Sequence, residues 1–89
     1  MSEKLSGAQM RAARALLRWT ALDLATAAKV GVATIRRVEV IDGEISATAA
    51  NQAAIRRALE HGGVVFIDEN GGGAGVRLRK PSERGPKVK

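Results

Sequence analysis

Two arginines follow three small residues near the middle of the chain, and residues of these types can contact the edges of DNA bases. Arg36 and Arg37 supply guanidinium groups, which form paired hydrogen bonds with guanine in the major groove. Val32, Ala33 and Thr34 are small enough for a helix to approach the bases closely. The first two can also press against thymine methyl groups. A helix with this exposed face can enter the major groove of double-stranded DNA.

Two short helices joined by a tight turn must hold these side chains. Apolar residues recur at helical spacing over residues 21–28 and again over residues 32–40. Thr20 can cap the first helix, with Asp23 completing an acidic variant of the capping box. The turn at 29–31 contains one apolar residue, which would fill the gap between the helices. The predicted buried positions are Leu22, Leu24, Ala25 and Ala28 in the first helix, and Ile35 and Val38 in the second.

Further helices flank this pair on both sides. Ser6 and Gln9 form a capping box that starts a helix running to about Arg18. Its arginines lie three and four residues apart, and we interpret Arg11 and Arg18 as facing solvent. Thr48 can cap a last helix, which a pair of glycines ends. The pattern therefore predicts four helices.

After the two glycines the hydrophobic period changes from helical to two. Residues 64–69 predict a strand, the glycine-rich segment 70–75 predicts a turn, and the alternation over 76–80 predicts a second strand. We therefore predict a mainly α fold. A four-helix domain at 1–62 is followed by a β-hairpin at 63–80, the predicted dimerisation element.

The first predicted strand has four consecutive apolar residues, so both of its faces need to be covered. The last helix can cover one face, and a second copy of the chain can cover the other in a symmetric dimer. We expect the helices to keep a separate core, and the two-fold axis to set two base-reading helices one DNA turn apart, roughly 34 Å. The predicted interface residues are Val64, Val65, Phe66, Ile67, Val76 and Leu78.

The positive charge is concentrated at the carboxyl end. The 89 residues carry 15 Lys and Arg against 9 Asp and Glu, a formal net charge of +6. Residues 77–89 hold six of the basic residues and one acidic residue, whereas residues 1–76 hold nine and eight. We predict that the basic tail at 81–89 is disordered. Two interpretations stay open: an arm that binds DNA phosphates, or a solvated terminus that only aids solubility.

The composition argues against several other classes of protein. There is no cysteine and only one histidine, so neither a disulfide nor a cysteine or histidine metal cluster is expected. No nucleophile–base set or pair of carboxylates is evident, so we expect neither an enzyme nor a cofactor. No apolar run has the length of a membrane span, and the first residues do not resemble a signal peptide. We therefore expect a cytoplasmic protein without membrane contact.

A pattern of residues at fixed spacing extends from the first predicted helix to the third without a gap. Its members are Arg14, Leu24-Ala25, Ala28, the turn Lys29-Val30-Gly31, Thr34-Ile35 and Glu39. The pattern over residues 8–60 resembles the lambda-repressor-like helix-turn-helix domain of the Cro/CI (Xre) family of regulators. The resemblance implies an ion pair between Arg14 and Glu39 that ties the first helix to the third.

The resemblance also implies a DNA-binding surface, from which this chain departs at three positions. Ala21 stands where the family usually has glutamine, and Gly31 replaces the usual hydroxyl cap. Lys29 replaces a turn glycine and would have to tolerate a positive φ. Backbone amides at the start of the second helix, at Thr20 and Ala21, are implied to meet phosphate. The implied base-facing residues are Val32, Ala33, Thr34 and Arg37.

These observations favour a sequence-specific DNA-binding transcriptional regulator that acts as a homodimer on an inverted-repeat operator. The alternative is a protein-interaction module, such as an antitoxin or antiactivator, that binds a regulatory partner protein through its hairpin. The basic charge, with Arg36 and Arg37, favours DNA. The loss of hydrogen-bonding side chains from the base-reading surface favours the alternative.

Overall fold

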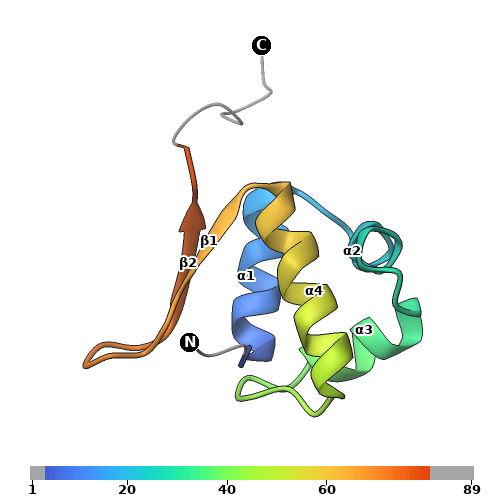
Figure 1. Ribbon diagram of the computed structural model, residues 1–89, viewed down its shortest axis with the longest axis horizontal. Helices are drawn as coiled ribbons and strands as arrows, with labels where there is room; N and C mark the ends of the chain where they lie inside the picture. The colour runs from blue at the N-terminus through green and yellow to red at the C-terminus, as the bar shows by residue number, and fades with distance from the viewer. Residues whose placement is uncertain (1–3, 81–89) are drawn as a thin grey trace.

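The computed structural model describes residues 4–80, in which four helices are followed by two strands (Figure 1). The elements are α1 (Gly7–Leu17), α2 (Ala21–Ala28), α3 (Val32–Glu39), α4 (Ala49–Gly62), β1 (Val64–Ile67) and β2 (Gly75–Leu78). The protein is thus mostly helical with an antiparallel hairpin after the helices, as the sequence predicts. The predicted disordered tail at 81–89 lies outside the described residues. No helix within residues 4–80 is long and apolar enough to cross a membrane.

Side-chain caps fix the starts of three helices. The Ser6 hydroxyl accepts a hydrogen bond from the Gln9 amide, and the Gln9 side chain accepts one from the Ser6 amide, both at 3.0 Å. Thr20 and Asp23 form the same reciprocal pair at the start of α2, at 3.0 and 2.9 Å. Thr48 caps α4 by accepting from the amide three residues on. Each cap satisfies backbone donors that have no partner inside the helix.

Residues in the left-handed region end α1 and α2. Arg18 has a φ of 61° and Lys29 a φ of 59°, a conformation that costs roughly 1–2 kcal/mol for a residue with a side chain. The expectation that Lys29 adopts a positive φ is therefore confirmed. Val30 packs against the core from the middle of the turn, and Gly31 precedes α3 as its cap residue without a side-chain hydrogen bond. Three residues thus suffice to join α2 to α3.

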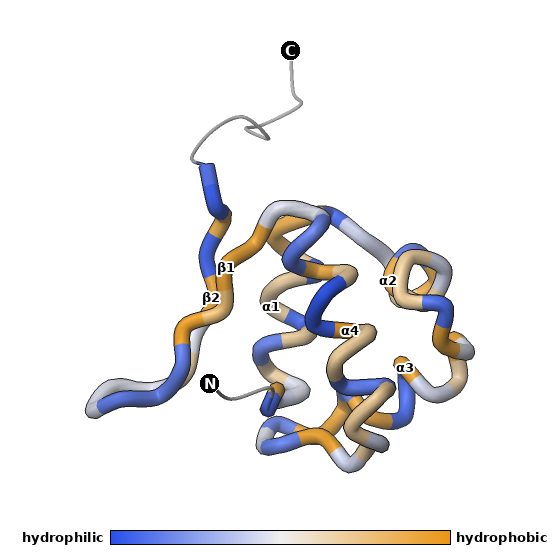
Figure 2. Tube along the Cα trace, in the orientation of Figure 1, coloured by the Kyte–Doolittle hydropathy of each residue, from blue (hydrophilic) through white to orange (hydrophobic). Residues whose placement is uncertain are grey.

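The central helices α1 and α4 have α2 and α3 on one side and the hairpin on the other (Figure 1). The core runs continuously from the helices into β1, which Figure 2 shows as an apolar segment beside them. The expectation of a separate helical core is therefore wrong, because the hairpin completes that core. The buried apolar residues are Leu5, Met10, Ala13, Leu17, Leu24, Ala25, Ala28, Ile35, Val38, Ile45, Ile55, Ala58, Leu59, Val64 and Phe66.

The pairing of the strands defines an inner and an outer face of the hairpin. Val64 pairs with Leu78 and Phe66 with Val76, and these four residues pack toward the core. The outer face carries the alternate pairs, Val65 with Arg77 and Ile67 with Gly75. The hairpin is also fastened by polar contacts. The Gln9 side chain donates to the Gly75 carbonyl at 3.0 Å, and the Arg56 guanidinium lies 5.1 Å from the centre of the Phe66 ring.

Leu22 and the end of the first strand also differ from the sequence predictions. Leu22 is 57% exposed, because the buried stripe of α2 passes through positions three and four apart that do not include it. That stripe consists of the partly buried Ala21 and the buried Leu24, Ala25 and Ala28. The first strand ends at Ile67 rather than at residue 69, because its partner strand begins at Gly75. Asp68 and Glu69 instead belong to the exposed connection between the strands.

Candidate nucleic-acid interface

The outward face of α3 is the main candidate for contact with nucleic acid. Ile35, Val38 and Glu39 form its buried side. The exposed positions follow one another at intervals of three and four residues, so they lie on one face of the helix. They are Ala33, Arg36, Arg37 and, directly after the helix, Val40, which is 72% exposed.

The five residues of α3 that were predicted to contact DNA differ in their exposure to solvent. Ala33, Arg36 and Arg37 are exposed, and Thr34 is half-buried. Val32 is also half-buried and packs against the core, so only part of its side chain is accessible. Sequence analysis missed Val40, although its position seven residues after Ala33 is the signal that could have found it.

The two arginines of this face have no partner within the described part of the chain. Neither the Arg36 nor the Arg37 side chain takes part in a hydrogen bond or an ion pair among residues 4–80. Arg14 and Arg56, by contrast, are each held by a carboxylate. The guanidinium donors of α3 therefore remain open to an anionic ligand or to base acceptors.

A bidentate ion pair fixes the carboxyl end of α3 against α1. Arg14 donates to the two carboxylate oxygens of Glu39, at 2.6 and 3.1 Å. A third bond, 2.8 Å long, runs from Arg14 to the Trp19 carbonyl, just before α2 begins. The Glu39 side chain is only 9% exposed and that of Arg14 is 22% exposed. This is the pairing that the sequence resemblance implies, and it orients α3 relative to α1 and to the segment that enters α2.

Arg11 makes a second link between α1 and the end of α3. Its guanidinium donates to the Glu39 carbonyl and to the carboxylate of Asp42. The interpretation of Arg11 as a solvent-facing side chain is therefore only half right, since the side chain is 41% exposed but is also bonded to the end of α3. Its partners are 28 and 31 residues away along the chain, so the local spacing contains no signal for them.

A hollow of about 440 Å³ lies between α3 and the start of α4. It brings Thr34 and Arg37 together with hydroxyl and amide side chains that sequence analysis did not assign to a site. These groups can donate hydrogen bonds to phosphate oxygens beside a helix that contacts bases. The additional lining residues are Ser46, Ala47, Thr48 and Asn51.

The start of α2 offers less to a phosphate than the resemblance implies. The capping box takes up the amides of Thr20 and Asp23, and Ala21 has no polar side chain to add. The Asp23 carboxylate places a negative charge beside these amides. Contact at this helix end would therefore depend on the amides of Ala21 and Leu22, which no side chain caps.

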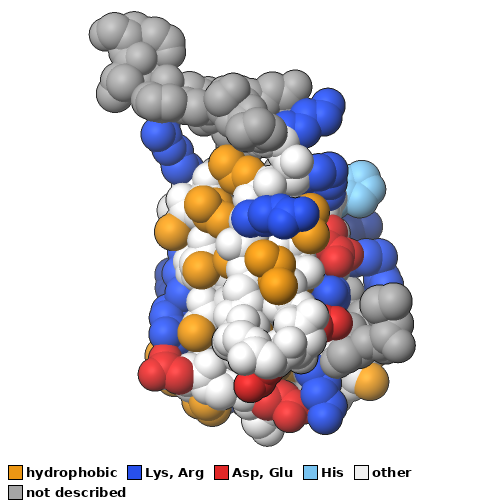
Figure 3. Space-filling view, turned by 90° about the vertical axis from the view of Figure 1, so that its left-hand side faces the viewer, with side chains coloured by type: hydrophobic (Ala, Val, Ile, Leu, Met, Phe, Trp, Pro, Cys, Tyr) orange, Lys and Arg blue, Asp and Glu red, His pale blue; other side chains and the backbone are white. Residues whose placement is uncertain are grey.

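The predicted dimer residues divide between the inside and the outside of the hairpin. Val64 and Phe66 are buried in the chain's own core, so they have no free surface to offer a partner. Val76 and Leu78 pack against that core and remain partly exposed. The outer-face members are the half-buried Val65 and Ile67, which is 38% exposed. Figure 3 views the molecule from the hairpin side and shows apolar side chains on this face.

The comparisons with known proteins add no family assignment. No family model, curated protein or solved structure matches this chain. Within residues 4–80 there is also no cluster of three or more histidine, aspartate or glutamate side chains that could hold a metal ion.

Proposed function

We propose that this protein is a sequence-specific DNA-binding transcriptional regulator of the helix-turn-helix class, acting in the cytoplasm with α3 as its recognition helix. The observation that carries the proposal is the exposed face of α3, where two arginines without partners stand beside small side chains. The ion pair of Arg14 with Glu39 supports it, because a recognition helix must be held rigidly by its scaffold.

The chemistry of this face divides into base contacts and backbone contacts. Arg36 and Arg37 can form paired hydrogen bonds with guanine or bind phosphate. Ala33 and Val40 can contact thymine methyl groups. The hollow between α3 and α4 supplies the hydroxyl of Thr48 for a neighbouring phosphate. Few polar side chains read bases in this arrangement, so one protomer recognises only a short sequence.

A homodimer formed through the hairpin would double the length of the recognised sequence. The outer face of the hairpin offers the apolar side chains of Val65 and Ile67. Acidic residues 68 and 69 follow β1 at one end of the hairpin, and basic residues 79 and 80 follow β2 at the other. A two-fold axis that lies in this face and runs perpendicular to the strands sets the acidic end of one hairpin against the basic end of its partner. Charge complementarity therefore favours an antiparallel pair of hairpins.

The position of the hairpin changes the expected spacing on DNA. The hairpin and α3 lie on opposite sides of the central helices (Figure 1). With roughly 10 Å for each of the five spacings between the six packed layers, two α3 helices in such a dimer are about 50 Å apart. The one-turn separation of roughly 34 Å suggested by the sequence therefore does not fit a dimer through the hairpin.

Selection of bound sequences from a random DNA pool tests the proposal. We expect an enriched inverted repeat whose half-site centres are more than one helical turn apart. Arg37→Ala should weaken binding by about 1–3 kcal/mol and relax one base position in each half-site. Arg18→Ala, which removes the same charge from the end of α1, is the matched control and should not change the selected sequence. Absence of any enriched sequence would refute DNA recognition, and a spacing near one turn would refute the hairpin dimer.

Sedimentation tests the dimer separately from DNA binding. Ile67→Asp should give monomers at micromolar concentration and keep the helical circular dichroism, because this side chain lies on the outer face. Leu22→Asp introduces the same charge at another exposed apolar position and should leave the dimer intact. A wild-type chain that sediments as a monomer would contradict this part of the proposal.

A protein-interaction module is the second candidate, favoured by the same apolar outer face of the hairpin. In that case Val65 and Ile67 would contact a regulatory partner protein rather than a second copy. A monomeric chain that selects no DNA sequence is the combination of results that this candidate predicts.

A further inference from the structure

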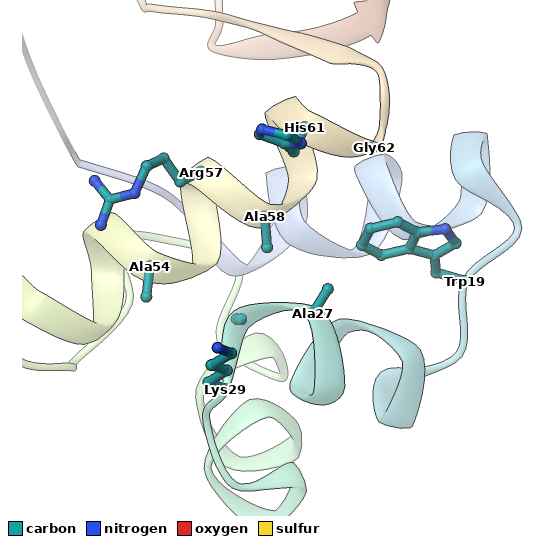
Figure 4. A pocket seen from close by; sticks show the side chains of 9 residues that line it. Trp19, Ala27, Lys29, Ala54, Arg57, Ala58, His61 and Gly62 are labelled. Carbon is teal, nitrogen blue, oxygen red and sulfur yellow. The ribbon is translucent and has the colours of Figure 1, made fainter.

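A second hollow lies further along α4, toward its carboxyl end, and no step of the proposed DNA recognition uses it. It has a volume of about 490 Å³ and lies between the end of α2 and the second half of α4 (Figure 4). This volume is in the range of small-molecule sites. The lining residues are Trp19, Ala27, Ala28, Lys29, Ala54, Arg57, Ala58, His61 and Gly62.

Small side chains and one indole ring create this hollow. Alanines from both helices line it, so the space that larger side chains would fill stays open. The Trp19 ring lies directly against the backbone of α4 at Gly62, where an added Cβ would stand 2.7 Å from a ring carbon. Trp19 packs on the core and is half-buried, so part of the ring remains exposed to the hollow. The result is an apolar site with a flat aromatic surface at one end.

The charged groups of this hollow are all basic. Lys29 and Arg57 are exposed, and their side chains have no hydrogen-bond or ion-pair partner among residues 4–80. No carboxylate lines the hollow, and the nearby carboxylate of Glu60 is bonded to Arg56. The carboxyl ends of α2 and α4 contribute only partial negative charge, about half a unit each. Two full positive charges therefore outweigh them.

We propose that this hollow binds a small organic anion with a flat apolar body, such as an aromatic carboxylate. The carboxylate would pair with the Arg57 guanidinium, which suits it geometrically, and Lys29 would add a second positive charge. The ring would lie over the alanines and against the exposed part of Trp19. This proposal does not rest on DNA binding, and direct measurement of the bound anion tests it.

The single tryptophan makes the site directly observable. Trp19 gives the only indole N–H signal in a nitrogen-15 NMR spectrum of the full chain. Titration with 2-naphthoate should shift this signal saturably, together with the backbone amides of Ala27 and Ala58. The neutral analogue 2-naphthamide has nearly the same shape and lacks the charge. It should bind about tenfold more weakly, because it loses the charge-assisted hydrogen bonds.

Two arginine variants separate this site from general attraction to a basic protein. Arg57→Gln should lower the naphthoate affinity about tenfold and leave the naphthamide affinity unchanged. Arg36→Gln removes an equally exposed arginine from α3 and should change neither. Equal affinity for the two probes, equal effects of the two variants, or shifts that are not centred on Trp19 would overturn the proposal. Ala54→Leu, which fills the hollow without touching its charges, should abolish binding of both probes.

Discussion

Replacing Glu39 with glutamine tests how α3 is held in place, because this change keeps the shape of the side chain and removes its charge. The Glu39 carboxylate is 9% exposed and accepts two hydrogen bonds from Arg14. Breaking a buried pair from one side costs about 3–5 kcal/mol. Arg14 is 22% exposed and retains its bond to the Trp19 carbonyl, so we place the expected loss of unfolding free energy lower, at about 2–3 kcal/mol.

Asp42→Asn provides a matched control in the same corner of the molecule. It makes the same chemical change in the second carboxylate that links α1 to the end of α3, but the Asp42 side chain is 84% exposed. An exposed pair contributes about 0–1 kcal/mol, so this variant should be almost as stable as the wild type.

Thermal and urea unfolding, followed by circular dichroism, measure the difference between the two variants. A loss of 2–3 kcal/mol lowers the melting temperature by about 8–24 °C in a domain of this size. The urea m-value should stay unchanged, because both variants expose the same surface on unfolding. Equal melting temperatures for Glu39→Gln and Asp42→Asn would refute the inference that burial makes the Arg14 pair the stronger link.

Three further predictions concern packing and capping, each measured by urea unfolding. Gly7→Ala should strongly destabilise the fold, because its Cβ would stand 1.7 Å from a backbone carbonyl oxygen, whereas Gly72→Ala, with open space around it, should be tolerated. Gly31→Ser should stabilise the fold by a few tenths of a kcal/mol by adding the missing cap of α3; a loss of stability would contradict this. Phe66→Ala should cost about 3–5 kcal/mol and Ile67→Ala far less, and equal losses would contradict the assigned faces of the hairpin.

Local rules predicted the starts of the helices well, because a helix cap involves residues only three positions apart. The reciprocal bonds of Ser6 with Gln9 and of Thr20 with Asp23 form where the sequence places them. The positive φ of Lys29 was expected because the family resemblance places a turn glycine at this position. Leu22 shows the limit of this approach. Whether it is buried depends on how α2 is rotated about its own axis, and residue spacing does not determine that rotation to within one residue.

Contacts between distant segments could not be predicted from spacing. The Arg14 pair with Glu39 was expected only through the resemblance to a regulator family, whereas the Arg11 bonds had no comparable guide. The packing of the hairpin on the last helix was expected, but its completion of the helical core was missed for the same reason. The four consecutive apolar residues of β1 show that both of its faces need cover, but only the packing shows that α1 and α4 cover the face bearing Phe66.

The candidate interface depends on a distinction between arginines that the sequence does not contain. Arg14, Arg56 and Arg79 all bond to groups within the fold, to carboxylates or backbone carbonyls, and they stabilise the arrangement of the elements. Nothing in the sequence around Arg36 and Arg37 distinguishes them from these arginines, yet their guanidinium groups have no partner among residues 4–80. An arginine paired with a carboxylate is already compensated, whereas an arginine without such a partner adds to the attraction of an anionic ligand. The net charge of the protein therefore overstates the positive charge that is available to DNA. The proposal of DNA binding depends on the guanidinium groups of Arg36 and Arg37 and on their exposed position on α3.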